Sequence, residues 1–297
     1  MFPARFDYFR PQTLEEALGL LQEHQGEAKV LAGGMSLIPL MKLRVAKPAR
    51  LIDIGRLSGL DGIEARDGEL AIGALARHAP LEESPLVREA VPLMADAAGV
   101  IGDTQVRNWG TIGGALAEAD PAGDWGPVVL ALNARLRCLS ARGERFIAAR
   151  EFFRDAYATA LASDELVTQV LVPGPGPGAT GAYLKLERKA GDFAIAGVAV
   201  QLAVDEQGVC REIGIGLGAV GLTPIKAVQA EAILRGQRLS EATLADAAEA
   251  AAREAEPVSD IRGSAAFKRD LVRALLRRAI EIALRRSRGE QVEAGHV

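Results

Sequence analysis

The stretch from Lys29 to Pro39, which reads Lys-Val-Leu-Ala-Gly-Gly-Met-Ser-Leu-Ile-Pro, constrains the fold of this chain most. Its apolar start predicts a short buried strand. Gly33-Gly34 predicts a turn, because glycine tolerates positive φ and close backbone approach. Ser36 is a favourable helix N-cap, and Pro39 is tolerated near a first helical turn. A strand, a glycine turn and a helix N-terminus attract anions. The stretch therefore predicts a cofactor phosphate site. A ligand-free turn is the alternative, because neither common nucleotide-binding glycine motif is matched.

Composition narrows the chemistry. A chain of 297 residues predicts about two domains. A net charge of −4 and a pI near 5.6 argue against nucleic-acid binding. Cys138 and Cys210 are too few for a disulfide framework, an iron–sulfur cluster or a Cys-type zinc site. His24, His78 and His296 are scattered, so each is predicted to be a surface or loop residue and no metal site is expected. Redox chemistry would need an organic cofactor or partner chains. Without an apolar leader or span, the protein is expected to be cytoplasmic.

The first 57 residues predict a β-α-β-α-β unit with parallel strands. The expected strands are 6–10, 28–32 and 50–54, and the helices begin at Thr13, in a capping box with Glu16, and at Ser36. Residues 58–173 predict a second, mostly antiparallel α+β unit. It has hairpins 62–74 and 135–149, a strand 165–172, two short helices before Ala98 and a helix 124–133.

Pro173 to Gly178 consists of proline and glycine only, which predicts a linker. Residues 179–288 then predict a C-terminal domain, a three-stranded antiparallel sheet with helices, and residues 289–297 a frayed tail. Its strands are expected at 182–188, 195–204 and 212–219, and its helices at 226–235, 240–254 and 264–286. The arginines that end the last helix are interpreted as a solvated face, with a partner-docking surface as the alternative.

A second glycine pair, Gly113-Gly114, lies between Thr111 and the acids Asp120 and Asp124. Thr111 could donate to a phosphate, and a carboxylate could accept from ribose or ribityl hydroxyls or from a flavin N–H. Two such glycine loops from one domain predict a grip on the two halves of a dinucleotide pyrophosphate.

With these motifs the sequence resembles the medium, FAD-binding subunit of the molybdenum hydroxylases, the family of xanthine oxidase and aerobic carbon monoxide dehydrogenase. The resemblance runs from about Phe6 to Arg286. Five ordered motifs support it: Ala32–Pro39, Gln105–Gly114, Asp120–Asp124, Tyr183–Ala194 and Ser259–Gly263.

The resemblance implies an α+β fold, in which two subdomains of the vanillyl-alcohol-oxidase (PCMH) type hold FAD ahead of the C-terminal domain. Ala32 to Ser36 would wrap the pyrophosphate, and Lys185 would reach the flavin pyrimidine edge, where a cation can stabilise the reduced flavin. Phe193 would lie by the flavin ring, with a core aromatic as the alternative. The implied cofactor-binding residues are Lys29, Val30, Leu31, Ala32, Gly33, Gly34, Met35, Ser36, Leu37, Val100, Ile101, Thr111, Gly114, Ala115, Ala117, Asp120, Asp124, Leu161, Lys185, Asp192 and Phe193.

Three positions depart from the pattern of the family. Met35 stands where relatives often have His or Gln, Ala115 where they often have Asn or Ser, and Glu118 where they often have His or another polar residue. Each change alters a possible hydrogen bond worth about 1 kcal/mol.

The implied role is electron transfer, with no catalytic acid–base residues and no metal in this chain. FAD would collect electrons from one of two [2Fe–2S] clusters of a small partner subunit and pass them to an external acceptor. A large subunit would hold the molybdenum cofactor, in a dimer of heterotrimers. The alternatives are a self-contained flavin oxidase or dehydrogenase of the vanillyl-alcohol-oxidase type and a flavin-less scaffold subunit.

Overall fold

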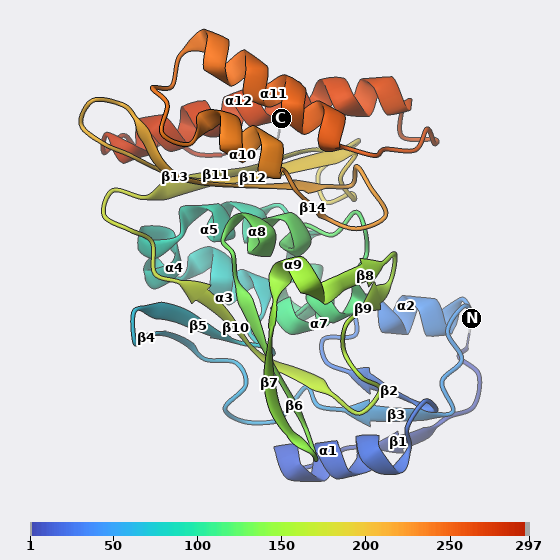
Figure 1. The fold of residues 1–297 in the computed structure, drawn as a ribbon. Helices are drawn as coiled ribbons and strands as arrows, with labels where there is room; N and C mark the ends of the chain where they lie inside the picture. The colour runs from blue at the N-terminus through green and yellow to red at the C-terminus, as the bar shows by residue number, and fades with distance from the viewer. Residues whose placement is uncertain (1, 295–297) are drawn as a thin grey trace.

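The computed structural model describes residues 2–294, which form stacked layers of sheets and helices (Figure 1). The first sheet has three parallel strands in the order β1-β3-β2, and α1 packs against it, as the β-α-β-α-β pattern predicted. The elements of this part are β1 (Asp7–Phe9), α1 (Leu14–Glu23), β2 (Ala28–Leu31), α2 (Leu37–Lys42) and β3 (Arg50–Asp53).

Two predicted helix caps differ from the structure. The Thr13 side chain accepts from the Glu16 N–H, but the Glu16 carboxylate accepts from the N–H of Gln12, one residue before the position that a capping box requires. Ser36 makes no side-chain cap bond, because its backbone is already helical, with φ −100° and ψ −52°. The Ser36 hydroxyl therefore contributes nothing to starting α2.

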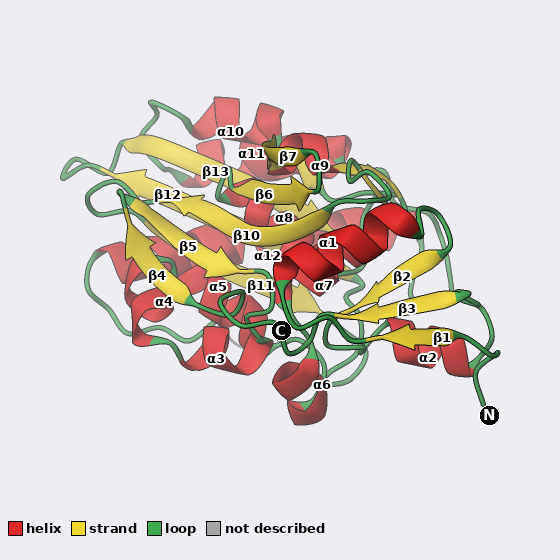
Figure 2. Cartoon of the chain, turned by 90° about the horizontal axis from the view of Figure 1, so that it is seen from below, coloured by secondary structure: helices red, strands yellow, loops and turns green. Residues whose placement is uncertain are grey.

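The second sheet is antiparallel, with the order β4-β5-β10-β6-β7, and both predicted hairpins are present. Figure 2 shows α1 lying across this sheet toward the small one. The strands are β4 (Ile63–Arg66), β5 (Glu69–Gly73), β6 (Arg135–Ser140), β7 (Gly143–Ala148) and β10 (Leu166–Pro173), with a small separate pair, β8 (Phe153–Asp155) and β9 (Ala158–Thr159).

The helices of this middle part differ from the prediction in number and place. Three helices rather than two precede Val100, because Pro85 and Pro92 each stand in a first turn and start a new helix. The glycine region from Gly99 to Asp124 is largely helical, so Gly113 and Gly114 lie inside a helix rather than a loop. The helices are α3 (His78–Glu83), α4 (Pro85–Ala90), α5 (Pro92–Gly99), α6 (Thr104–Trp109), α7 (Ile112–Glu118), α8 (Trp125–Ala131) and α9 (Ala149–Phe152).

The C-terminal part is an antiparallel sheet, β11-β12-β13-β14, under three helices (Figure 1). A three-stranded sheet was predicted; the fourth strand, β14, has only two residues and pairs with Gly216 and Leu217, too short for any sequence pattern. The elements are β11 (Thr180–Leu186), β12 (Ala196–Val204), β13 (Cys210–Gly218), β14 (Ile225–Lys226), α10 (Val228–Leu234), α11 (Glu241–Glu254) and α12 (Ala265–Ser287).

A row of glycines joins this sheet to the middle layer. Gly214, Gly216 and Gly218 alternate along β13 and so share one face of the sheet. A Cβ on Gly214 would lie 1.9 Å from the carbonyl oxygen of Ala131, and one on Gly216 equally close to that of Pro127. The backbone of α8 therefore rests directly on the sheet, while α12 covers the other face.

The end of the chain is tied down as far as it is described. The predicted frayed tail is wrong for Glu290 and Val292, since Arg285 pairs with the Glu290 carboxylate and the Arg286 guanidinium donates to the Val292 carbonyl at 2.8 Å. Arg286 also forms a two-bond pair with Asp96 of α5, at 2.7 and 2.9 Å. Arg286 therefore joins α12 to the middle layer and does not belong to a solvated face of the helix. Residues 295–297 of the predicted tail lie outside the described residues.

Candidate cofactor site

The turn between β2 and α2 presents a row of unused donors. Gly34 has φ +75°, which favours glycine. Within residues 2–294, the backbone N–H groups of Gly33, Gly34, Met35 and Ser36 have no hydrogen-bond acceptor. Gly34 is buried and Gly33 and Met35 are half-buried, so water cannot fully satisfy these groups. Consecutive free N–H groups at a helix start are an arrangement that can bind an anion, so the phosphate site expected from the sequence stays a prediction for this turn.

The second glycine pair is built differently. The Gly113 N–H donates to the carbonyl of Ala74 at 2.9 Å, and the Gly114 N–H donates to the Thr111 hydroxyl oxygen at 3.2 Å. A Cβ on Gly113 would lie 2.5 Å from the Cβ of Ala74. This pair therefore allows α7 to pack against the residues after β5, and it does not offer the free N–H groups that its likeness to the first pair predicted.

The two glycine segments lie against each other. A Cβ on Gly33 would stand 1.9 Å from the carbonyl oxygen of Trp109 and 3.0 Å from Cα of Gly110. A Cβ on Gly114 would come within 3.8 Å of the Ala32 Cβ. The fold thus brings together residues about 80 positions apart, which is the convergence that the sequence predicted.

His78 supports the contact between the two glycine segments through its bond to Gly110. Its backbone N–H donates to the Gly110 carbonyl at 3.2 Å, and its Nδ1 accepts from the Trp125 indole N–H at 3.2 Å. Burial, aided by the nearby Arg107 charge, lowers the pKa of His78 to about 4. The prediction of a surface or loop histidine is wrong here, since His78 is only 3% exposed. His24 is half-buried at the end of α1, and His296 lies outside the described residues.

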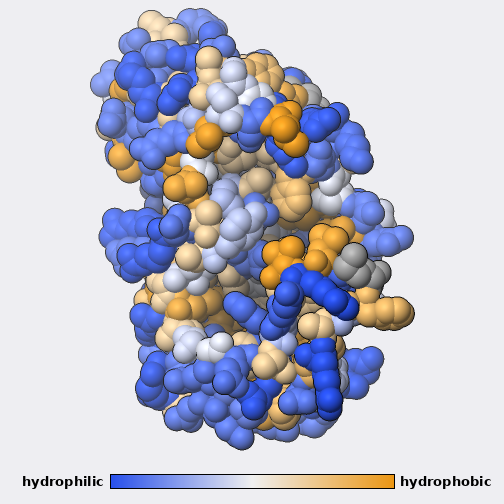
Figure 3. All heavy atoms as spheres, turned by 90° about the vertical axis from the view of Figure 1, so that its right-hand side faces the viewer, coloured by the Kyte–Doolittle hydropathy of each residue, from blue (hydrophilic) through white to orange (hydrophobic). Residues whose placement is uncertain are grey.

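A cavity of about 400 Å³ lies between the middle layer and the C-terminal part, at one side of their interface. Asp120 and Tyr157 line it from the middle layer, and Phe193, Val258 and Arg262 from the other side. Figure 3 looks onto the right-hand side of Figure 1, where apolar side chains border a hollow at mid-height. Phe193 is 51% exposed, so it is not a core aromatic, which was the alternative interpretation of this residue.

Behind the cavity, Asp124 joins the two parts through a buried polar network. Its carboxylate accepts from the Tyr183 hydroxyl at 2.7 Å and from the Lys185 ammonium at 3.2 Å. Burial raises the pKa of Asp124, and the Lys185 charge opposes this. Lys185 also pairs with Glu187 and donates to the Asp192 carbonyl, both at 3.2 Å. Two of the three ammonium protons are thus used in hydrogen bonds, to Asp124 and to the Asp192 carbonyl, and Glu187 adds an ion pair.

The other predicted residues lie on several elements around these features. Lys29 to Leu37 lie on β2, the turn and the start of α2, and Ala115 and Ala117 follow Gly114 on α7. Val100 is buried and Ile101 is half-buried at the end of α5. The loop with Asp192 packs against Gly102, which follows Ile101, since a Cβ on Gly191 would lie 2.9 Å from the Gly102 carbonyl oxygen. Leu161 packs on the central core.

Sequence reasoning assigned no role to several residues that shape the site. Arg262 belongs to the quoted Ser259–Gly263 motif, yet nothing in the motif indicated that it lies over Phe193. Asp96, the partner of Arg286, carries no local signal, because the two residues are 190 positions apart.

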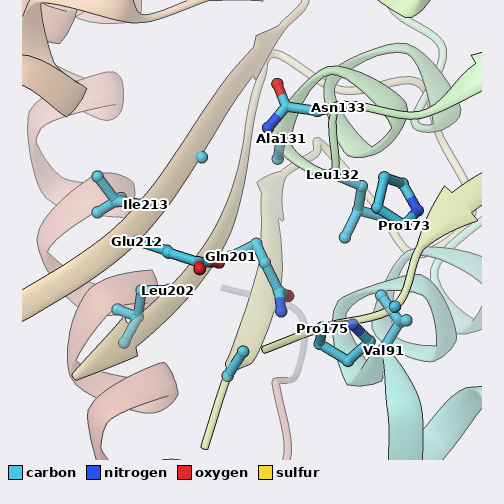
Figure 4. Close-up of a pocket in the computed structure, with 13 residues that line it drawn as sticks. Val91, Ala131, Leu132, Asn133, Pro173, Pro175, Gln201, Leu202, Glu212 and Ile213 are labelled. Carbon is cyan, nitrogen blue, oxygen red and sulfur yellow. The ribbon is translucent and has the colours of Figure 1, made fainter. Parts of the chain in front are cut away.

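A second, smaller cavity of about 130 Å³ lies on another side of the same interface (Figure 4). Val91, Ala131, Gln201 and Glu212 are among the side chains that line it. None of the predicted cofactor residues does, so this cavity is separate from the glycine turns.

Comparison with known proteins agrees with this geometry. Residues 4–175 match the family described as the FAD binding domain in molybdopterin dehydrogenase, and residues 181–283 match the CO dehydrogenase flavoprotein C-terminal domain. The chain is 38% identical, over the whole of both chains, to the 6-hydroxypseudooxynicotine dehydrogenase complex subunit alpha of Paenarthrobacter nicotinovorans. It is also 38% identical to the carbon monoxide dehydrogenase medium chain of Hydrogenophaga pseudoflava, over 95% of this chain and 98% of that one.

A solved carbon monoxide dehydrogenase from Hydrogenophaga pseudoflava, which lacks the Mo-pyranopterin moiety of its cofactor, superposes with a TM-score of 0.93. The superposition has 40% identity and covers 96% of this chain and 99% of that chain. The predicted α+β fold and the resemblance are therefore confirmed, and the chain belongs to the molybdenum hydroxylase flavoproteins, the FAD-binding medium subunits of enzymes such as carbon monoxide dehydrogenase.

Proposed function

We propose that this chain binds FAD and serves as the electron-transfer subunit of a molybdenum-containing oxidoreductase complex. The observation that carries the proposal is the row of four unpaired N–H groups from Gly33 to Ser36. Half-buried backbone donors without acceptors are rare in folded proteins unless a ligand satisfies them. A pyrophosphate supplies the acceptors and the negative charge that such a turn favours.

The residues around the turn fit the rest of the cofactor. Ala32 to Ser36 would hold the pyrophosphate by backbone donors, and the Thr111 hydroxyl retains a proton that it can donate. Asp120 and Phe193 line a cavity that could receive the ring system, and 400 Å³ is the size of a small-molecule site. Asp192 directly precedes Phe193 on the same loop. When bound, FAD supplies the capacity to take up electrons and to pass them on.

Lys185 acts indirectly in this proposal. Its charge is held beside Asp124, Glu187 and the Asp192 carbonyl. From there it fixes the loop that carries Asp192 and Phe193 toward the cavity.

The partners follow from the family. A small subunit with two [2Fe–2S] clusters would supply electrons, a large subunit would hold the molybdenum cofactor, and the complex would be a dimer of heterotrimers that works in the cytoplasm. Among the described residues, no helix is long and apolar enough to cross a membrane. No group of three or more histidine, cysteine or acidic side chains within residues 2–294 is arranged to hold a metal. We further propose one domain boundary after Leu57 and a second at the linker 173–178.

The direct test is to purify the complex and to record its visible spectrum and its FAD content after heat release. We expect a flavin band and one FAD for each copy of this chain. The isolated full chain should rebind FAD and should lose it in competition with ADP, which shares the pyrophosphate. A complex with wild-type subunit composition and no flavin would overturn the proposal.

A further inference from the structure

Arg262 makes three contacts with one loop at the mouth of the cavity. Its guanidinium donates to the Phe193 carbonyl at 2.7 Å and to the Asp192 carboxylate at 3.3 Å. The same group lies 5.9 Å from the centroid of the Phe193 ring, within the range of a cation–π contact. Backbone, side chain and ring of the 192–193 segment are therefore all held by one arginine.

The arginine itself is held by a rigid turn. The Asp260 carboxylate accepts from the Arg262 N–H at 2.8 Å and from the Lys268 ammonium at 2.7 Å. Lys268 is only 4% exposed and also donates to the Val258 carbonyl at 3.0 Å. Asp260 and Gly263 exchange two backbone hydrogen bonds, which close the turn. A buried lysine on α12 thus anchors an acid, and the acid fixes the arginine.

Phe193 would otherwise have little to hold it. The ring is 51% exposed, and its loop, from Glu187 to Ile195, has no regular structure. Phe193, Arg262, Asp260 and Lys268 all line the same cavity. We propose that Arg262 is a positioning residue, which holds the Phe193 ring as a fixed wall of the cavity and so limits the access of small molecules to the flavin ring.

This inference rests on the proposed function, because it assigns the cavity to the flavin ring. The test uses the full chain loaded with FAD and measures quenching of the flavin fluorescence by acrylamide, a neutral probe. A neutral quencher is required, since removal of a positive charge would alter the local concentration of an ionic one. The variants are Arg262→Met, which keeps the apolar stem, Arg262→Lys, Phe193→Ala and the double variant. Arg273→Ala is the matched control, because Arg273 also pairs with acids, Glu249 of α11 and Asp270 of α12, but does not line the cavity.

We expect Arg262→Met to raise the quenching constant about threefold, which corresponds to the loss of one exposed cation–π contact. Arg262→Lys should give an intermediate value, because an ammonium keeps the charge but not the planar fork. Phe193→Ala should raise the constant at least as far, and Arg262→Met should add nothing to it, since both act through one ring. The control should match the wild type.

Each remaining outcome counts against the inference or against its premise. If Arg262→Met binds FAD fully and is quenched like the wild type, Arg262 does not position the wall. An equal further effect of Arg262→Met in the Phe193→Ala background would mean that Arg262 acts on the fold and not through Phe193. If the wild-type chain binds no FAD, the proposed function fails before this question arises.

Discussion

The two glycine pairs look alike in sequence and differ in what their backbones do. Gly33-Gly34 leaves its N–H groups without acceptors. The N–H groups of Gly113-Gly114 donate to the Ala74 carbonyl and the Thr111 hydroxyl. Both glycines lie in α7, which packs against the residue after β5. One pair is the proposed binding surface, and the other supports it, since the two segments pack against each other.

The difference teaches that a glycine pair is ambiguous until its hydrogen bonds are known. Lack of a Cβ permits close approach by a phosphate or by another backbone. At Gly33 another backbone makes this approach, since the Trp109 carbonyl takes the place of a Cβ, while the N–H groups stay unpaired and open to the proposed phosphate. A comparison of variants in the two pairs therefore separates binding from support.

The largest effect is expected for Gly33→Ala. The new Cβ would stand 1.9 Å from a backbone oxygen, which cannot move aside as a flexible side chain could. We expect a loss of about 3 kcal/mol in the free energy of unfolding, at the upper end for overpacking. FAD affinity should fall more than about tenfold, because the turn that presents the N–H groups is displaced. Urea unfolding and FAD titration measure the two quantities.

Gly113→Ala is the matched control, since its Cβ would meet the Ala74 Cβ at 2.5 Å. It should cost a similar stability, while the molecules that remain folded bind FAD within about threefold of the wild type. Equal loss of FAD affinity in both variants would contradict the distinction between the two pairs.

A smaller effect is expected from acid, through His78 beneath the contact. Its folded-state pKa of about 4 lies below the ordinary value of 6.5. The unfolded chain therefore binds more protons between these values, so stability is complete above pH 6.5 and is lost as the pH falls toward 4. Between pH 7 and pH 5 this amounts to about 2 kcal/mol.

The check is urea unfolding at several pH values for the wild type and for His78→Asn, which retains an acceptor for the Trp125 N–H. The variant should lose most of the slope in this range. His24→Asn serves as control and should retain it, because His24 lies at the end of α1, outside the contact of His78 with Trp125 and Gly110. An unchanged slope in His78→Asn would mean that other groups cause the acid sensitivity.

Local patterns predicted the parallel β1–β3 unit, both hairpins and the long strands, because periodicity and turn residues are local signals. They failed where tertiary contacts decide. His78 reads as an isolated polar residue, and only the fold places it between Trp125 and Gly110. The basic end of α12 reads as a solvated face, yet Arg286 is paired with Asp96.

The site was predicted in part for the same reason. Ala32 to Ser36 is a continuous stretch, so its turn and its free donors follow from five adjacent residues. The surroundings of Lys185, which was expected to reach the flavin pyrimidine edge, depend on Asp124, 61 positions away, and no local pattern shows that pairing. Arg262 lies 69 residues beyond Phe193, and no spacing rule connects them.

Thr111→Val examines the support itself. It leaves the Gly114 N–H at the start of α7 without its acceptor. A lost N-cap of this kind should reduce the free energy of unfolding by about 1.5 kcal/mol, and Thr111→Ser should restore it. We expect FAD affinity to fall less than in Gly33→Ala, because at most one donor to the phosphate is removed. A loss of affinity as large as that of Gly33→Ala would make Thr111 a principal ligand of the pyrophosphate.

The smallest effect is expected at Met35, inside the first turn. Its backbone N–H is one of the four unpaired donors, and its half-buried side chain cannot donate a hydrogen bond. Met35→Gln adds an amide donor next to the phosphate position without altering the backbone. One added hydrogen bond is worth about 1 kcal/mol, so FAD should bind about fivefold more tightly. Leu43→Gln, at the far end of α2 and 66% exposed, is the control and should leave affinity unchanged. If Met35→Gln binds FAD like the wild type, the backbone donors alone determine the affinity of this turn, and the contrast between the two glycine pairs becomes one of main-chain hydrogen bonding only.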